Sequence, residues 1–156
     1  IGSGLVGSEM CIRDRDKIMW KKAQGTIRPL DAPMAGYENK NGVFIARTEF
    51  EGGIHPCKFV DNFGCYVSYG GKEYGVKDFE YYIGNVKWVK CNNHQIPDGA
   101  ILAGREADGK LLYIGRTEYE GMIITGKVGT HLAKGICIPY AGKEWELSDY
   151  EVLVAD

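Results

Sequence analysis

The amino-acid sequence predicts an all-β protein made of two homologous β-rich repeats that pack about a pseudo-two-fold axis. Composition is the first sign, because the 156 residues include 22 glycines, about twice the usual share of ~7%. Ten tyrosines and three tryptophans add the aromatic content that is typical of strands. The second sign is a series of turn dipeptides between short β-branched and aromatic segments. The third is an internal repeat along most of the chain.

Short strands are expected between the turn signals. In the last segment, Tyr150, Val152 and Val154 share one face by period-two alternation. No segment offers ten residues of clean helical periodicity with caps. Strands at this spacing suggest a sandwich or a small barrel-like assembly. The expected strands cover residues 43–50, 65–69, 79–83, 111–119, 135–140 and 150–154, with turns at Asn41-Gly42, Gly52-Gly53, Gly70-Gly71, Asp98-Gly99 and Asp108-Gly109.

The internal repeat consists of ordered matches at a nearly constant offset. It predicts a first repeat unit over residues 19–84 and a second over residues 86–155. Two such units usually pack about a pseudo-two-fold axis, and this packing allows them to exchange a strand. The matches are Trp20 with Trp88, Glu38 with Glu106, 47–52 with 116–121, Lys58 with Lys127 and 69–73 with 140–144, at offsets that grow from 68 to 71.

The first fifteen residues do not resemble the rest of the chain. Residues 1–15 are rich in Gly and Ser, end in alternating charges and fit a signal peptide poorly. They look like a translated sequencing adaptor. We therefore interpret them as a non-native artefact and expect the authentic chain to start near Met19.

Charge, hydropathy and cysteine usage exclude several partners. A net charge of −2 argues against nucleic acid, and no apolar run approaches the ~20 residues of a membrane-spanning helix, so no membrane insertion is expected. Without Cys11, four cysteines remain, with no CxxC pair. Reduced thiols are therefore expected, in a cytoplasmic or non-classically secreted protein, with a homodimer left open. The four cysteines are Cys57, Cys65, Cys91 and Cys137.

No arrangement of residues indicates catalysis. The three histidines have no metal-ligand spacing and are expected at the surface. We therefore predict no metal, no cofactor and no enzymatic activity. Structural roles are expected for the remaining repeated residues: core anchors for Trp20 and Trp88, cross-strand pairing for Arg47 and Arg116, and tight turns for Lys72-Glu73 and Lys143-Glu144.

Five separated motifs carry a family resemblance, namely IPDGAILAG, DGKLLYIGRTEYEG, TGKV, IPYAGKE and DYEVLV. In this order they resemble the DM-nine repeat, which occurs alone or attached to pore-forming domains in natterin-like proteins. No pore-forming domain is recognised here. The resemblance covers both units and implies a β-rich tandem pseudo-dimer. For the lectin members of the family it also implies binding of mannose-containing glycans in innate-immune pattern recognition.

The resemblance places a sugar site in each unit. In mannose-binding members, an acid after the Ala-Gly-aromatic step and the lysine of a Pro-Gly-Lys step hold the sugar. These positions fall on Glu106 and Lys127 in the second unit and on Glu38 and Lys58 in the first. The chain departs from the pattern because Glu replaces Asp in both units, and the longer side chain moves the carboxylate by about one bond, ~1.5 Å.

Sugar chemistry suits this pair of residues. A carboxylate accepts hydrogen bonds from two adjacent hydroxyls of a pyranose, while an ammonium donates to their lone pairs. The alternative from the residues alone is a surface ion pair that contributes ~0–1 kcal/mol. A carbohydrate-binding, mannose-type lectin is therefore predicted. The alternative function is a protein-interaction module that has lost sugar binding.

Overall fold

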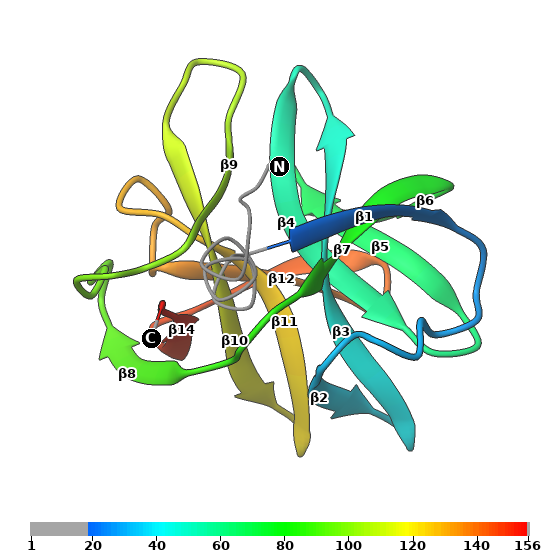
Figure 1. Cartoon of the computed structure of the whole chain (residues 1–156). Coiled ribbons are helices and arrows are strands. Elements are labelled where there is room, and N and C mark those ends of the chain that lie inside the picture. Colours follow the sequence, from blue (N-terminus) through cyan, green and yellow to red (C-terminus); the bar gives the residue numbers. More distant parts are fainter. Residues whose placement is uncertain (1–18, 156) are drawn as a thin grey trace, which may run out of the picture.

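The computed structural model describes residues 19–155, and every secondary-structure element in it is a β-strand. The all-β prediction is confirmed (Figure 1). The proposed artefact at residues 1–15 lies outside the described residues. The first unit forms β1 (Met19–Gln24), β2 (Met34–Glu38), β3 (Asn41–Phe50), β4 (Gly53–Val60), β5 (Gly64–Tyr69), β6 (Lys72–Val76) and β7 (Asp78–Ile83). The second forms β8 (Trp88–Asn92), β9 (Leu102–Arg105), β10 (Leu111–Tyr119), β11 (Met122–Val128), β12 (Ile136–Tyr140), β13 (Lys143–Leu147) and β14 (Asp149–Leu153).

The strand order is symmetric about its centre. It runs β1-β7-β3-β2-β11-β12-β13 and then β6-β5-β4-β9-β10-β14-β8, with further pairings of β3 with β4 and β10 with β11. Each strand of the first unit therefore has its counterpart at the same distance from the opposite end. The centre of the order is the junction of β13 with β6, where the two units meet.

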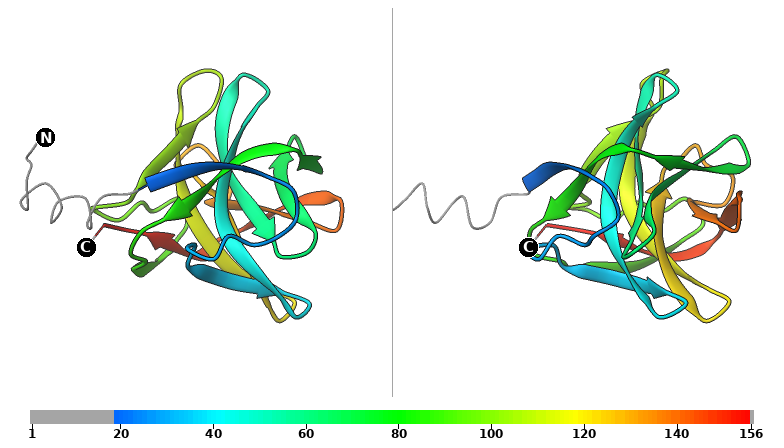
Figure 2. Two further views of the ribbon diagram at one scale, coloured as in Figure 1. Left: turned by 45° about the vertical axis from the view of Figure 1, so that its right-hand side comes forward. Right: turned by 90° about the vertical axis from the view of Figure 1, so that its right-hand side faces the viewer.

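Each unit places one strand on the other unit. Strand β2 pairs with β3 of its own unit and with β11 of the second, while β9 pairs with β10 and with β4 of the first. Figures 1 and 2 show the β3–β4 and β9–β10 hairpins side by side at one end of the molecule. The β2–β3 and β10–β11 hairpins lie together at the opposite end. The two units are thus interlocked through shared strand pairing.

Glycines permit this close approach. A Cβ atom on Gly36 would lie 2.1 Å from the carbonyl oxygen of Ile123, and one on Gly104 would lie 2.0 Å from that of Ile54. Both glycines belong to the repeated Ala-Gly step in the sequence. The step is therefore a packing requirement of the contact between the units.

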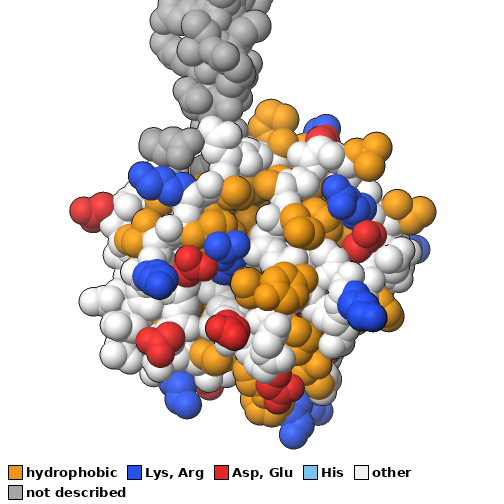
Figure 3. Space-filling model, turned by 90° about the horizontal axis from the view of Figure 1, so that it is seen from below, with side chains coloured by type: hydrophobic (Ala, Val, Ile, Leu, Met, Phe, Trp, Pro, Cys, Tyr) orange, Lys and Arg blue, Asp and Glu red, His pale blue; other side chains and the backbone are white. Residues whose placement is uncertain are grey.

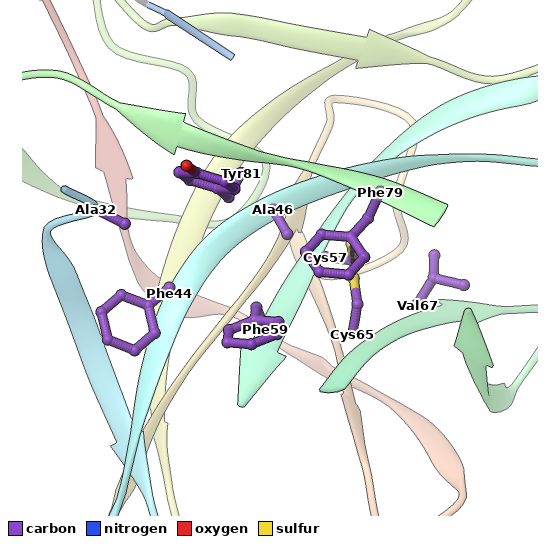
Figure 4. Close-up of a cluster of buried hydrophobic side chains, with 9 residues drawn as sticks. All are labelled: Ala32, Phe44, Ala46, Cys57, Phe59, Cys65, Val67, Phe79 and Tyr81. Carbon is purple, nitrogen blue, oxygen red and sulfur yellow. Dashed lines mark hydrogen bonds between the residues drawn. The ribbon is translucent and has the colours of Figure 1, made fainter. Parts of the chain in front are cut away.

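The core has three parts, one in each unit and one between them. Figure 4 shows the first-unit cluster, in which the ring centroids of Phe59 and Phe79 lie 5.3 Å apart and the sulfur atoms of Cys57 and Cys65 lie 3.4 Å apart. All four described cysteines are free thiols. The cluster between the units takes residues from both, with Trp20 and Trp88 packed against it: Ala35, Ile45, Tyr82, Ile101, Ala103, Ile114 and Leu153.

Three turns lie one or two residues away from their expected positions, and the one expected at Asp108-Gly109 is made by Ala107 and Asp108. The expected Asn41-Gly42 turn is wrong, because both residues lie in β3 and the turn uses Asn39 and Lys40, whose φ angles are 51° and 84°. Asparagine tolerates this left-handed region better than most residues do. The Gly52-Gly53 turn is instead made by Glu51 and Gly52. No helix within residues 19–155 is long and apolar enough to cross a membrane.

Candidate functional site

The first lysine cluster consists of Lys58 and the side chains around it. Lys58 lies on β4 and its side chain is only 1% exposed. Its Nζ atom lies 2.5 Å from Glu38 Oε1 at the end of β2 and 3.2 Å from Glu73 Oε2 on β6. The sequence-predicted pair of Glu38 and Lys58 is therefore in direct contact, and a second carboxylate joins it. One cation balances two anions, which leaves the cluster with a formal charge of −1.

Aromatic rings enclose this ammonium. Its Nζ atom lies 5.8 Å from the ring centroid of Tyr66 and 5.4 Å from that of Tyr140. At these distances the negative faces of the rings attract the cation. Tyr140 belongs to the second unit, so both units build the first cluster.

The second lysine cluster surrounds Lys127 on β11, which is also buried. Its Nζ atom donates to the carbonyl oxygen of Ser68 at 2.9 Å and to His55 Nδ1 at 3.2 Å. Glu144 Oε2 lies 3.5 Å from the same atom, and the ring of Tyr69 lies 5.4 Å away. His55, Ser68 and Tyr69 come from the first unit. The second cluster is therefore also shared between the units.

Glu106 also belongs to the second cluster. Among the described residues it contacts two histidines and forms no ion pair with Lys127. Its Oε2 atom lies 2.9 Å from His131 Nε2, and its Oε1 atom lies 4.0 Å from His55 Nε2. The imidazole of His55 thus stands between the two sequence-predicted residues. The two clusters are related by the repeat but differ in detail.

The glutamates at the β5–β6 and β12–β13 turns connect the two clusters. Glu73 Oε1 accepts a hydrogen bond from the Gly142 amide at 2.8 Å, and Glu144 Oε1 accepts one from the Gly71 amide at 3.0 Å. Each glutamate therefore holds a turn of the other unit with one oxygen. Its second oxygen faces the lysine of its own unit.

Comparison with known protein families identifies a match over most of the described residues. The DM9 repeat family matches residues 37–147 of the chain. The chain belongs to the DM9 repeat family. The matched range includes the lysines and glutamates of both clusters.

The fold of this DM9 protein also resembles solved structures. The crystal structure of the nematode sperm cell motility protein MFP2B matches with a TM-score of 0.64 at 13% sequence identity. The match covers 90% of this chain and 47% of that one, so the chain spans about half the length of its structural relative. At this identity the likeness concerns the fold alone. A search of the curated proteins finds no match.

Sequence reasoning missed several members of the two lysine clusters. Glu73 and Glu144 follow the repeated Gly-Lys step and were expected as turn residues, although their repetition with the lysines was a usable signal. The surface position expected for His55 is wrong, because its side chain is 0% exposed. His55 faces the other unit, and the pattern of a single strand cannot show such a neighbour.

The repeated arginines have structural roles, as the sequence suggested. Arg47 Nε donates to Glu80 at 2.8 Å, and its guanidinium carbon lies 4.2 Å from the ring centroid of Trp20. A further bond from Arg47 reaches the carbonyl oxygen of Ala103 in the second unit at 3.1 Å. Arg116 makes the equivalent contacts with Glu151, Trp88 and the carbonyl oxygen of Ala35.

Two open grooves lie beside these arginines, away from the lysine clusters. They occupy equivalent positions in the two units of the DM9 fold, and their linings share no described residue with either cluster. The charged lining of the first is Lys22, Arg47, Glu49, Asp78 and Glu80, and that of the second is Lys90, Arg116, Glu118, Asp149 and Glu151. Two cations and three carboxylates in each give no clear preference for a charged ligand.

The surface carries charges of both signs. Figure 3 shows Lys and Arg interspersed with Asp, Glu and hydrophobic side chains on the face seen from below. Among residues 19–155, no group of three or more His, Cys, Asp or Glu side chains is arranged to hold a metal ion.

The buried imidazole of His55 makes stability depend on pH. Burial, reinforced by the charge of Lys127, lowers the pKa of His55 from 6.5 to about 4. The unfolded chain therefore takes up this proton at a higher pH than the folded protein, so stability falls as the pH drops from 6.5 towards 4. We expect a loss of about 2 kcal/mol between pH 7 and pH 5, measured by urea unfolding. In the His55→Gln variant the free energy of unfolding should lack this part of its dependence on pH. An unchanged pH dependence would contradict the prediction.

Proposed function

We propose that the protein is a carbohydrate-binding module of the mannose-lectin type, with one sugar site at each lysine cluster, and that it acts in innate-immune pattern recognition. The observation that carries the proposal is the repeated burial of a lysine ammonium behind partly exposed carboxylates. Glu38 and Glu73 are 18% and 13% exposed, whereas Lys58 is 1% exposed. A ligand at this surface meets carboxylate oxygens first and the ammonium behind them.

This arrangement suits the hydroxyl groups of a pyranose. A carboxylate accepts hydrogen bonds from sugar hydroxyls, and charge-assisted bonds of this kind are strong. The Lys58 ammonium donates to Glu38 and lies 3.2 Å from Glu73, so it holds both carboxylates in position for sugar hydroxyls. The association of the DM9 repeat family with sugar-binding and immune-type roles supports the same proposal.

Stability alone explains the clusters poorly. Removing two carboxylates and an ammonium from water has a cost that mutual attraction often fails to offset, and apolar replacements of similar shape are frequently as stable. The net charge of −1 at the nearly buried first cluster increases this cost. The charge cluster is therefore better explained by a ligand than by the fold.

A protein-interaction module without sugar binding is the second candidate. The deep burial of Lys58 and Lys127 favours it, because neither ammonium is open to a ligand without movement of its neighbours. For either candidate we propose a non-enzymatic role. The free thiols support a cytoplasmic or non-classically released protein.

Capture by mannan-coated beads distinguishes the two candidates. The charge-free variant Glu38→Gln/Lys58→Met/Glu73→Gln removes the charges of the first site while keeping its shape. Glu106→Gln/Lys127→Met/Glu144→Gln removes the charges of the second site and also the donor to Ser68 and His55. Individual sites are expected to bind with a Kd of about 1 mM, so bead capture depends on avidity. Each triple variant should weaken capture, and their combination should abolish it, with free mannose competing in every case.

An exposed ion pair provides the matched control. Lys21 and Asp31 are 49% and 45% exposed and their charged atoms lie 2.8 Å apart, and neither residue belongs to a cluster, so Lys21→Met/Asp31→Asn should leave capture unchanged. Folding of every variant is followed by circular dichroism. Undiminished capture by the folded combined variant would refute the sugar sites and favour the interaction module.

A further inference from the structure

The Nε2 atom of His55 forms no hydrogen bond within the described residues, although the backbone of Phe50 lies close enough to the ring to favour its protonated form. The side chain of His55 is 0% exposed. The ammonium of Lys127 can only donate, so His55 Nδ1 accepts its hydrogen bond. The neutral imidazole therefore carries its hydrogen on Nε2. A buried donor without a partner costs free energy and calls for an explanation.

The unpartnered donor faces the sequence-predicted acid of the second unit. His55 Nε2 lies 4.0 Å from Glu106 Oε1, too far for a direct hydrogen bond. One oxygen atom can lie about 2.8 Å from both atoms at that separation, accepting from the imidazole and donating to the carboxylate. A hydroxyl group combines these two properties, whereas an ammonium can only donate and a carboxylate can only accept.

We infer that His55 donates a hydrogen bond from Nε2 to a sugar hydroxyl that also donates to Glu106, which makes His55 a specificity-determining residue of the second cluster. The inference rests on the proposed function and deepens it. Glu106 is 19% exposed and supplies the outer side of this position. His55 comes from the first unit, so the second unit cannot form the site alone.

The first cluster has no equivalent of this donor among the described residues. The residue that matches His55 at the offset of 69 is Ile124, which is buried and apolar. The two sugar sites are therefore different: the first offers carboxylates, an ammonium and tyrosine rings, and the second adds an imidazole N–H. A sugar without the hydroxyl that bridges His55 and Glu106 should bind more weakly at the second cluster only.

His131 covers the position until the ligand arrives. Its Nε2 atom lies 2.9 Å from Glu106 Oε2, and both side chains are 19% exposed, above a fully buried His55. Entry of a hydroxyl requires His131 to move away from Glu106. Removing the imidazole with His131→Ala should therefore tighten binding at the second cluster, by about threefold or more.

Two conservative variants separate the donor from the structural role of His55. In His55→Asn, the amide oxygen can still accept from Lys127 but no donor reaches Glu106. In His55→Gln, the longer side chain places an amide N–H near the original Nε2 position. Both are made in the Glu38→Gln/Lys58→Met/Glu73→Gln background, so that only the second cluster binds. Methyl α-mannopyranoside is titrated into the full chain and followed by two-dimensional ¹H–¹⁵N NMR, which also reports folding.

We expect His55→Asn to weaken the mannoside Kd about tenfold, as for a lost hydrogen bond to a charged network, and His55→Gln to stay within about threefold of the parent. The imidazole Nε2 resonance of the wild-type protein should move on titration, which tests the contact even where His55→Asn fails to fold. An unchanged Kd in His55→Asn with a static Nε2 resonance would indicate a bridging water only and overturn the inference, leaving the proposed function intact. No mannoside binding at either cluster of the wild type would instead refute the proposed function, and the inference with it. A weaker Kd in His131→Ala would overturn the covering role.

Discussion

Replacing Gly104 by alanine is expected to lower the free energy of unfolding by about 3 kcal/mol or more. The new Cβ atom would lie 2.0 Å from the carbonyl oxygen of Ile54, which is backbone and cannot rotate away. Relief requires β9 to separate from β4, which breaks a contact between the two units. Forcing atoms into a packed interior typically costs about 1–3 kcal/mol, and a backbone clash lies at the upper end of that range.

Gly75 provides the matched control for this substitution. It also lies in a strand, but a Cβ atom there would meet only the ring of Tyr66, at an ordinary 3.5 Å. Gly75→Ala should therefore change stability by less than about 1 kcal/mol, because the loss of unfolded-state freedom favours alanine slightly. Gly36→Ala should behave like Gly104→Ala, since its Cβ atom would lie 2.1 Å from the Ile123 carbonyl oxygen. Urea unfolding measures all three, and equal midpoints for the Gly104 and Gly75 variants would contradict the interlocked packing.

The contact between the two units is the part of the fold that the sequence could not predict. The strands over 43–50 and 111–119 were predictable because alternation, β-branched residues and flanking glycines are local signals, and the structure places β3 and β10 there. The pairing of β2 with β11 depends on residues far apart in the chain, so no local sequence signal predicts it. The repeat predicted that the units resemble each other without showing how they contact.

The candidate site divides in the same way. Glu38 and Lys58 were selected by resemblance, and the structure brings them together. His55 lacks a counterpart in the second unit, so the repeat could not draw attention to it, and its burial arises from the other unit. Residues that act across the boundary between repeats are therefore the ones that a comparison of the repeats with each other misses.

Replacing Lys58 alone should lower the free energy of unfolding far more than removing all three charges of the first lysine cluster. Lys58→Ala leaves the Glu38 and Glu73 carboxylates facing each other near a new cavity, without the ammonium that holds both. Removing one partner of a buried ion pair typically costs about 3–5 kcal/mol, so we expect a loss of about 4 kcal/mol in urea unfolding at pH 7. The charge-free variant Glu38→Gln/Lys58→Met/Glu73→Gln leaves no unpaired charge. Its free energy of unfolding should lie within about 1 kcal/mol of that of the wild type, or above it.

This contrast separates a structural role from a binding role. If the cluster existed to stabilise the fold, the charge-free variant would lose at least as much stability as Lys58→Ala, and that result would contradict our proposal. If the cluster exists for a ligand, the charge-free variant keeps its stability and loses first-site sugar binding. The amide oxygens that replace the Glu38 and Glu73 carboxylates would still accept hydrogen bonds, but neither they nor the methionine carry the charge that strengthens bonds to hydroxyls. A stable protein with an inactive first site is therefore the expected outcome.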